Sequence, residues 1–209
     1  MNEIIVAGAG VGVLTCEVQE AVNRADAVCC ARRFAGLIPQ GKRHILLGKF
    51  SDAFDEIASE SGRVVILVSG DPGVFSLLPL VEGRFPGRVR VLPGISSLQV
   101  LCAQVGESWS DAVILSCHGR SLNVGRFLNV VERNRLVILF CDKITSPQYV
   151  CQSLSRLSDV SVVIGENLGT DSEHVLSGNP QDFVNHTSPE LSLILVRNES
   201  PFRVNVHPR

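Results

Sequence analysis

The sequence has few aromatic residues, little excess of either charge and no long hydrophobic run, and each of these shortages excludes a class of protein. Aromatic residues make up 5% of the 209 residues, and the formal net charge is −2. Because nothing in this charge balance indicates a surface for phosphates, we expect no nucleic acid partner. No run approaches the ~18 apolar residues that cross a bilayer, and no basic segment followed by an apolar run opens the chain. We therefore expect a cytoplasmic protein that does not bind membranes.

Paired cysteines of the kind found in zinc sites and redox dithiols are also missing, although the chain contains seven cysteines. No two of them are spaced as CxxC, so we expect neither a metal site nor a catalytic dithiol. The cysteines are scattered among apolar residues. We expect most of them to be small buried side chains in a reducing compartment.

Aliphatic residues, by contrast, are abundant, and hydrophobic residues make up 45% of the chain. Short runs of Val, Leu and Ile are typical of strands that are buried on both faces of a parallel or mixed sheet. Such runs alternate with helical periodicities, which predicts an α/β fold with doubly wound sheets. The pattern restarts near residue 110, so we expect two αβα units, residues 1–108 and 109–209, with a cleft between them. A last strand over residues 191–197 should be antiparallel to its neighbour.

A glycine-rich loop follows the first predicted strand at residues 8–12 (GAGVG). Such a loop forms a tight turn or lets the backbone approach a ligand closely. It departs from the dinucleotide-binding motif GxGxxG, because Val13 stands where the third glycine is required. Arg32 and Arg33 occupy the place of the acid that binds a ribose. The arginine pair leaves an NADP-binding regulatory module as an alternative from another functional class.

Two further loops follow predicted strands at residues 69–73 (SGDPG) and 93–97 (PGISS). Ligands of open α/β sheets bind where strands end, so Asp71 is placed to accept hydrogen bonds from ribose hydroxyls. Capping of the following helix is the alternative for Asp71. Ser96 and Ser97 are placed to bind a ligand carboxylate or ammonium group, and a helix N-cap is the simpler interpretation of them.

A fourth loop follows another predicted strand, at residues 165–170 (GENLGT). Its polar residues and its second glycine suit a loop that lines one side of a binding site for a flat ring. The four loops together resemble, in order and spacing, those of the tetrapyrrole methylase family: GAGVG at 8–12, SGDPGVFS at 69–76, PGISS at 93–97 and GENLGT at 165–170. The resemblance covers nearly the whole chain. It implies a two-domain fold, S-adenosyl-L-methionine as the methyl donor, C-methylation of a tetrapyrrole and a homodimer.

Three segments resemble the branch of this family that methylates C5 of a corrin-ring precursor in cobalamin biosynthesis: PGISSLQ at 93–99, LSCHGR at 115–120 and ENLGT at 166–170. The part that methylates C15 is not expected here, and a separate C15-methylating and decarboxylating enzyme is a candidate partner. Methylation of another ring position, or of a non-tetrapyrrole acceptor, remains an alternative. Val11 departs from the family pattern, since many members carry proline there.

The resemblance also implies where the ligands bind. The residues that match cofactor-binding positions are Val11, Gly70, Asp71, Val74, Phe75, Ser96, Ser97, Cys141, Asn167, Leu168 and Gly169. The substrate carries acetate and propionate carboxylates, for which arginine and lysine are suited. The candidate substrate-binding residues are Gly10, Gly12, Arg32, Arg120 and Lys143, with Arg33 and Arg126 as further cations. A solvated surface charge is the alternative for each cation.

Methyl transfer from a sulfonium is an in-line displacement, in which alignment and the exclusion of water matter most. A reduced tetrapyrrole meso carbon is itself nucleophilic, so no Ser/His/Asp triad is expected. Any assistance to proton loss would come from an acceptor in a loop at a strand end. The candidates are Asp71, His118 and Glu166.

Overall fold

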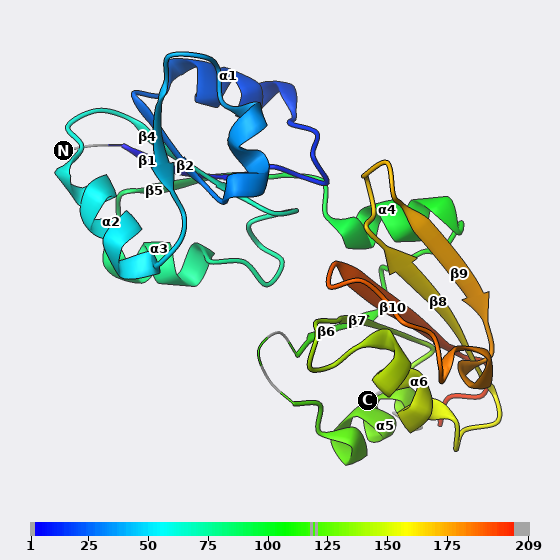
Figure 1. The fold of residues 1–209 in the computed structure, drawn as a ribbon. Helices are drawn as coiled ribbons and strands as arrows, with labels where there is room; N and C mark the ends of the chain where they lie inside the picture. The colour runs from blue at the N-terminus through cyan, green and yellow to red at the C-terminus, as the bar shows by residue number, and fades with distance from the viewer. Residues whose placement is uncertain (1–2, 118, 120, 203–209) are drawn as a thin grey trace, which may run out of the picture. The chain divides into compact units, whose positions relative to one another are not determined.

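The computed structural model describes residues 3–117, 119 and 121–202. The chain divides into two compact units, Met1–Ser97 and Leu98–Arg209. Each unit contains one five-stranded sheet with helices on both faces (Figure 1). The predicted α/β class with two αβα units is therefore confirmed. No helix in the described part of the chain combines the length and the apolar character that crossing a membrane requires.

The first sheet is entirely parallel, with strand order β3-β2-β4-β1-β5. Its strands are β1 (Ile4–Gly8), β2 (Ala27–Cys30), β3 (Arg43–Leu46), β4 (Val64–Val68) and β5 (Val89–Leu92). The helices are α1 (Cys16–Arg24), the 3-10 helix η1 (Arg32–Leu37), α2 (Phe50–Ser59) and α3 (Leu78–Arg84).

Both faces of the first sheet are covered, as Figure 1 shows for α1 on one face and α2 and α3 on the other. Alternate residues of a strand point to opposite faces. Ile4 and Val6 of β1 pack in one cluster with Phe54 of α2. Ile5 belongs to the other cluster with Val18 of α1. Because the central strands are buried on both faces, their amino-acid sequences are continuous apolar runs.

The second sheet is mixed, with strand order β6-β7-β10-β8-β9. Its strands are β6 (Val113–Ser116), β7 (Leu136–Phe140), β8 (Val160–Glu166), β9 (His174–Gly178) and β10 (Ser192–Asn198). β10 is antiparallel to both β7 and β8, as the sequence predicted for the last strand. The helices are α4 (Ser97–Gln104), α5 (Val124–Arg133), α6 (Pro147–Leu154) and the 3-10 helix η2 (Pro180–Phe183).

The boundary between the units lies at residue 97 and not at the predicted residue 108. Helix α4 packs on the sheet of the second unit and covers the face opposite α5 and α6 (Figure 1). Leu98 and Leu101 of α4 share an apolar cluster with Leu136 and Val163. The helix was assigned to the first unit because no sequence signal marks the break before it.

Most cysteines are buried, as expected. Five are buried, Cys117 is half-buried and Cys16 is exposed. Burial raises the pKa of the Cys30 and Cys102 thiols to about 11 and that of Cys151 to about 12. These thiols are therefore neutral at physiological pH and act as small apolar side chains.

Candidate functional site

The first two predicted loops meet at the edge of the first sheet where its parallel strands end. The Gly10 N–H donates to Gly70 O over 3.3 Å, and the Gly70 N–H donates back to Gly10 O over 3.1 Å. Both glycines have positive φ, 57° and 63°. Because this region of φ is strained for other residues, glycine allows the two loops to pair. The loop after β1 is thus joined to the loop after β4.

The third predicted loop approaches the other two so closely that a side chain would not fit. A Cβ atom at Gly94 would lie 2.7 Å from Gly8 Cα and would overlap the carbonyl oxygen of Gly70. A Cβ atom at Gly8 would likewise overlap the Gly94 backbone. The three loops therefore form one assembly of backbone, which we call the glycine junction (Gly8, Gly70 and Gly94).

The Asp71 carboxylate connects two of these loops by hydrogen bonds. Its Oδ1 accepts the Gly73 N–H over 2.7 Å, and its Oδ2 accepts the Gly94 N–H over 3.2 Å. Helix α3 begins only at Leu78 with Leu77 as its N-cap, so Asp71 does not cap that helix. The predicted bond from Asp71 to a ribose stays a prediction, while its bonds to the backbone of two loops are a structural role that the sequence did not reveal.

The other predicted cofactor residues of the first unit lie around the same loops. Val11 and Val74 are half-buried, and Ser96 is 2% exposed. Ser97 is the first residue of α4. Phe75 has a positive φ of 46°, a strained conformation for an aromatic residue, and its side chain is 57% exposed.

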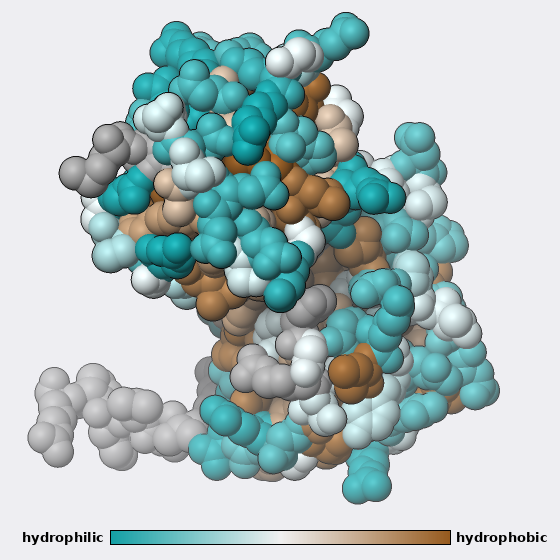
Figure 2. All heavy atoms as spheres, turned by 60° about the vertical axis from the view of Figure 1, so that its left-hand side comes forward, coloured by the Kyte–Doolittle hydropathy of each residue, from teal (hydrophilic) through white to brown (hydrophobic). Residues whose placement is uncertain are grey.

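Large apolar side chains are exposed on these loops. Val13 is 62% exposed and Ile95 is 42% exposed, in addition to Phe75. Figure 2 shows hydrophobic side chains gathered among hydrophilic ones on the face that it presents. Exposed apolar side chains beside backbone amides suit a ligand with a flat apolar part and a polar part.

The candidate cations of the first unit stand at the end of β2. Arg32 and Arg33 begin η1 and are exposed. The Arg33 guanidinium lies 4.8 Å from the centre of the Phe34 ring, which is a cation–π contact. The second strand ends at the same edge as β1 and β4, since all of them are parallel. Whether these arginines bind a substrate stays a prediction.

A second set of loops lies at one edge of the second sheet. Strands β6, β7 and β8 end there, because β6 is parallel to β7 and β10 is antiparallel to both β7 and β8. Cys141 follows β7 and is 6% exposed, and its N–H donates to Ser192 O over 3.1 Å. Lys143 is exposed and forms an ion pair of 3.0 Å with Glu190. Arg126 lies on α5 and is exposed.

The loop after β8 contains three predicted cofactor residues in different environments. Asn167 has a positive φ of 47°, and its N–H donates to Leu191 O over 2.8 Å. Gly169 also has a positive φ, and its N–H donates to Glu173. Leu168 is 7% exposed and packs in the apolar cluster with Leu101. The side chain of Leu168 is therefore a core side chain, and only its backbone is available to a ligand.

Two of the three predicted proton acceptors have polar partners. Asp71 binds the two backbone N–H groups described above. Glu166 is 5% exposed at the end of β8, and its Oε1 lies 2.8 Å from His186 Nε2. The pair brings His186, from the segment before β10, to the candidate site. His118 and Arg120, predicted for catalysis and substrate binding, lie outside the described residues.

Sequence reasoning missed two residues at this edge, Asp142 and His186. Asp142 follows β7 within two residues, so its place at a strand end was a usable signal. His186 lies in a segment without periodicity or motif, and nothing in the sequence marks it.

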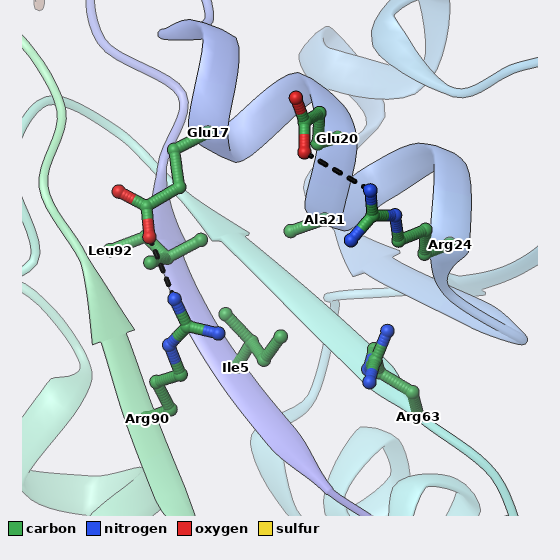
Figure 3. Close-up of a pocket in the computed structure, with 8 residues that line it drawn as sticks. All are labelled: Ile5, Glu17, Glu20, Ala21, Arg24, Arg63, Arg90 and Leu92. Atoms are coloured by element: carbon green, nitrogen blue, oxygen red, sulfur yellow. Dashed lines mark hydrogen bonds and ion pairs between the residues drawn. The ribbon is translucent and has the colours of Figure 1, made fainter.

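A pocket of ≈ 200 Å³ in the first unit lies beside α1 and β5 (Figure 3). Its lining extends from Arg63, which precedes β4, to Leu92, which ends β5. Arg90 and Glu17 point toward each other across it at 2.7 Å, and Arg24 pairs with Glu20 at 3.3 Å. Its arginines are thus neutralised by neighbouring carboxylates, and none of the predicted site residues lines it.

The model of the family Tetrapyrrole (Corrin/Porphyrin) Methylases matches residues 3–183. A cobalt-precorrin-7 C(5)-methyltransferase of Salmonella typhimurium is 30% identical over 173 residues, which cover 80% of this chain and 84% of that protein.

Solved structures share the fold. The precorrin-6Y methylase of cobalamin biosynthesis from Archaeoglobus fulgidus has a TM-score of 0.73 at 24% identity, covering 94% of this chain and 98% of that one. A uroporphyrin-III C-methyltransferase from Thermus thermophilus, complexed with S-adenosyl homocysteine, has a TM-score of 0.68 at 18% identity, covering 92% and 96%. The family model covers most of the chain, including the four loops predicted to bind ligand, and leaves out residues 184–209, which contain β10. The chain belongs to the tetrapyrrole (corrin/porphyrin) methylases.

Proposed function

We propose that this protein transfers a methyl group from S-adenosyl-L-methionine to C5 of a corrin precursor, cobalt-precorrin-7 or precorrin-6Y, in cobalamin biosynthesis. The observation that carries the proposal is the glycine junction, where three loops of the family motif are joined at one edge of a parallel sheet. Support also comes from the relative that bears the name of this C5-methyltransferase.

The residues at the junction fit the donor. When bound, S-adenosyl-L-methionine supplies an electrophilic methyl group on a positively charged sulfur. The exposed side chains of Phe75 and Ile95 would cover its apolar parts, and the buried Ser96 lies beside Gly70 at the junction. In the second unit, the backbone of Cys141, Leu168 and Gly169, together with Asn167, is proposed to hold the adenine.

The contribution of the protein is alignment and the exclusion of water. An in-line displacement gains most of its rate when donor and acceptor are held in line, so rigid loops are more useful here than a nucleophilic side chain. Asp71 serves this role by holding Gly73 and Gly94 with one carboxylate. Gly10 and Gly12 allow a flat macrocycle to approach the backbone, and Arg32 and Lys143 are proposed to bind its carboxylates.

Glu166 is the proposed proton acceptor at the second edge, with His186 as its partner. The contact of 2.8 Å between them can hold the carboxylate in one orientation and can carry a proton between the two groups. Asp71 is less suited to this task, because both of its oxygens already accept backbone N–H groups.

The proposal is tested by titration and by product analysis. We expect S-adenosylhomocysteine to bind with micromolar or tighter affinity in calorimetry, while NADP, the ligand of the alternative module, gives no heat. Incubation with isolated corrin intermediates and a 13C-labelled donor should place the new methyl group on C5 in NMR spectra. A label on another ring carbon would support the alternative of a different methylation position. NADP binding without S-adenosylhomocysteine binding would refute the proposal.

Asp71→Asn should raise the dissociation constant of S-adenosylhomocysteine roughly tenfold or more, because the loss of a hydrogen bond to a charged acceptor costs about 1.5–3 kcal/mol. The side-chain carbonyl of asparagine can still accept the Gly73 N–H. Its amide N–H₂ then faces the Gly94 N–H, so the hydrogen bond to Gly94 is lost because both groups are donors. Asp26→Asn is the matched control, since Asp26 also accepts a backbone N–H, that of Arg63 over 2.7 Å, at the opposite edge of the same sheet. Equal affinities of the two variants would show that Asp71 has no part in cofactor binding.

A further inference from the structure

The loop between β8 and β9, residues 167–173, is closed by one carboxylate, that of Glu173. Its Oε2 accepts the Gly169 N–H over 2.5 Å, and its Oε1 accepts the side-chain amide of Gln104 on α4. Two backbone turns add to this, because the Thr170 N–H donates to Asn167 O and the Glu173 N–H donates to Thr170 O, each over 3.0 Å. Glu173 therefore holds the middle of the loop and also attaches the loop to a helix.

Helix α4 holds this loop at two points of one face. Leu101 and Gln104 are three residues apart, so their side chains lie on the same side of the helix. Leu101 packs in the apolar cluster with Leu168, and a Cβ atom at Gly165 would lie 2.8 Å from Leu168 Cδ1 and 3.0 Å from Leu101 Cδ1. The loop is thus packed on α4 at its buried side, while Gln104 and Glu173 bind each other at the surface.

The apolar contact by itself leaves the backbone after Leu168 free to turn. Gly169 is exposed and has a positive φ of 77°. Because glycine adopts positive and negative φ about equally well, a bond from its neighbourhood has to select one conformation. The bond from the Gly169 N–H to the Glu173 carboxylate makes this selection.

We propose that Glu173 is a positioning residue for the cofactor, which holds the loop after β8 in the shape that lines the adenine. Glu173 acts through Gly169, whose N–H it occupies. The inference rests on the proposed function for the identity of the ligand, because Asn167 and Gly169 are assigned to the adenine there. It rests on the hydrogen bonds alone for the connection itself.

Three substitutions divide the contacts of Glu173. Glu173→Ala removes both of its bonds, and Gln104→Ala removes only the attachment to α4. Glu173→Gln keeps an oxygen for the Gly169 N–H, and its N–H₂ can donate to the Gln104 side chain once that amide has rotated. Asp182→Ala is the matched control, because Asp182 also accepts a backbone N–H in the second unit, that of Asn179 over 2.8 Å, at the turn after β9.

Hydrogen exchange followed by NMR tests the connection without any ligand. In Glu173→Ala, the Gly169 amide should exchange at least about tenfold faster than in the wild type, because it loses its acceptor. The Asn167 amide is an internal reference, since its N–H donates to Leu191 O. Asp182→Ala should leave both amides unchanged. Unaltered exchange of Gly169 in Glu173→Ala would overturn the connection, whether or not the protein is a methyltransferase.

Calorimetry with S-adenosylhomocysteine and with 5′-deoxy-5′-methylthioadenosine tests the positioning role, because the two ligands share the adenosine part. Glu173→Ala should raise both dissociation constants by the same factor, about tenfold, since binding then has to order the loop. Glu173→Gln and Asp182→Ala should stay within about threefold of the wild type. Gln104→Ala should have a smaller effect than Glu173→Ala, because Gly169 keeps its bond.

Four results would overturn the positioning role. They are faster exchange of Gly169 with unchanged affinities, equal losses of affinity in Glu173→Gln and Glu173→Ala, equal losses in Gln104→Ala and Glu173→Ala, and a loss for S-adenosylhomocysteine that the shorter ligand does not share. A wild-type protein that binds neither ligand would refute the proposed function and the positioning role together. The exchange data would still decide whether Glu173 holds Gly169.

Discussion

Gly94→Ala is expected to lower the free energy of unfolding of the first unit by about 3 kcal/mol and to abolish cofactor binding, because the added methyl group overlaps rigid backbone. The atoms in the way are Gly8 Cα and the Gly70 carbonyl oxygen, which belong to the other two loops of the glycine junction. Neither can rotate aside as a side chain can. The three loops must separate to accept the methyl group, and the proposed cofactor site would be lost with them.

Gly83→Ala is the matched control for this substitution. Gly83 lies within α3, and a Cβ atom there would meet nothing within 4 Å. Alanine should stabilise the helix by about 0.5–1 kcal/mol, because it loses less backbone entropy on folding. Urea denaturation followed by circular dichroism measures both variants. If Gly94→Ala unfolded at the same urea concentration as the wild type, the close approach of the three loops would be refuted.

Glu107→Ala is expected to lower the free energy of unfolding of the second unit by about 1.5–3 kcal/mol, because it removes the carboxylate that binds the partly buried Arg197 and one of the two carboxylates that bind Arg135. Glu107 precedes β6 and its side chain is 13% exposed. Its Oε2 accepts from Arg197 of β10 over 2.7 Å, and its Oε1 accepts from Arg135 over 2.9 Å. Arg135 also binds Asp111. The group joins the segment after α4 to β10 and to the residue that precedes β7.

The fluorescence of Trp109 measures this effect, since the single tryptophan and the single tyrosine both lie in the second unit. Glu190→Ala provides the control in the same unit, because the Glu190 ion pair with Lys143 is more than half exposed and should contribute less than about 1 kcal/mol. Equal losses of stability in the two variants would show that the Glu107 group is no stronger than a surface ion pair.

The same carboxylate predicts the pH dependence of the second unit. Burial acts to raise the pKa of Glu107, but hydrogen bonds from Arg197 and Arg135 outweigh it and hold the pKa below the usual 4.5. A carboxyl with a lowered pKa in the folded state stabilises it fully above the unfolded-state pKa. The difference in stability between wild type and Glu107→Ala should therefore be constant at neutral pH and shrink as the pH falls below 4.5.

The sequence predicted most of the strands and the loops after them, because these depend on local patterns, but it did not predict β3. Strand β4 is a run of five buried aliphatic residues, and the loops at its end and at the end of β1 carry the glycines that their backbone requires. The antiparallel last strand was also predicted correctly. These features are encoded within short segments of the chain.

Features that depend on distant segments were not predicted. The burial of the Leu168 side chain was not predicted, because it packs against Leu101 of a helix that the sequence assigned to the other unit, while the place of this residue in a ligand-binding wall stays a prediction. Asp142 was overlooked because its partner Gly119 belongs to another loop. His186 reaches Glu166 from a segment without a pattern. Each of these contacts is set by the sheet and cannot be inferred from the local sequence.

The place of β10 has a consequence for the order in which the protein folds during synthesis. This strand is formed by the last described segment of regular structure, yet it lies between β7 and β8 inside the second sheet. Until Asn198 has left the ribosome, β7 and β8 have no partner on these edges, and the backbone N–H and C=O groups there stay open to pairing with other chains. The first sheet needs only residues up to Leu92, so it can form while the second unit is still being made. The nascent chain therefore carries a finished first unit and an unfinished second one, and the unfinished sheet is the surface that chaperones would have to protect.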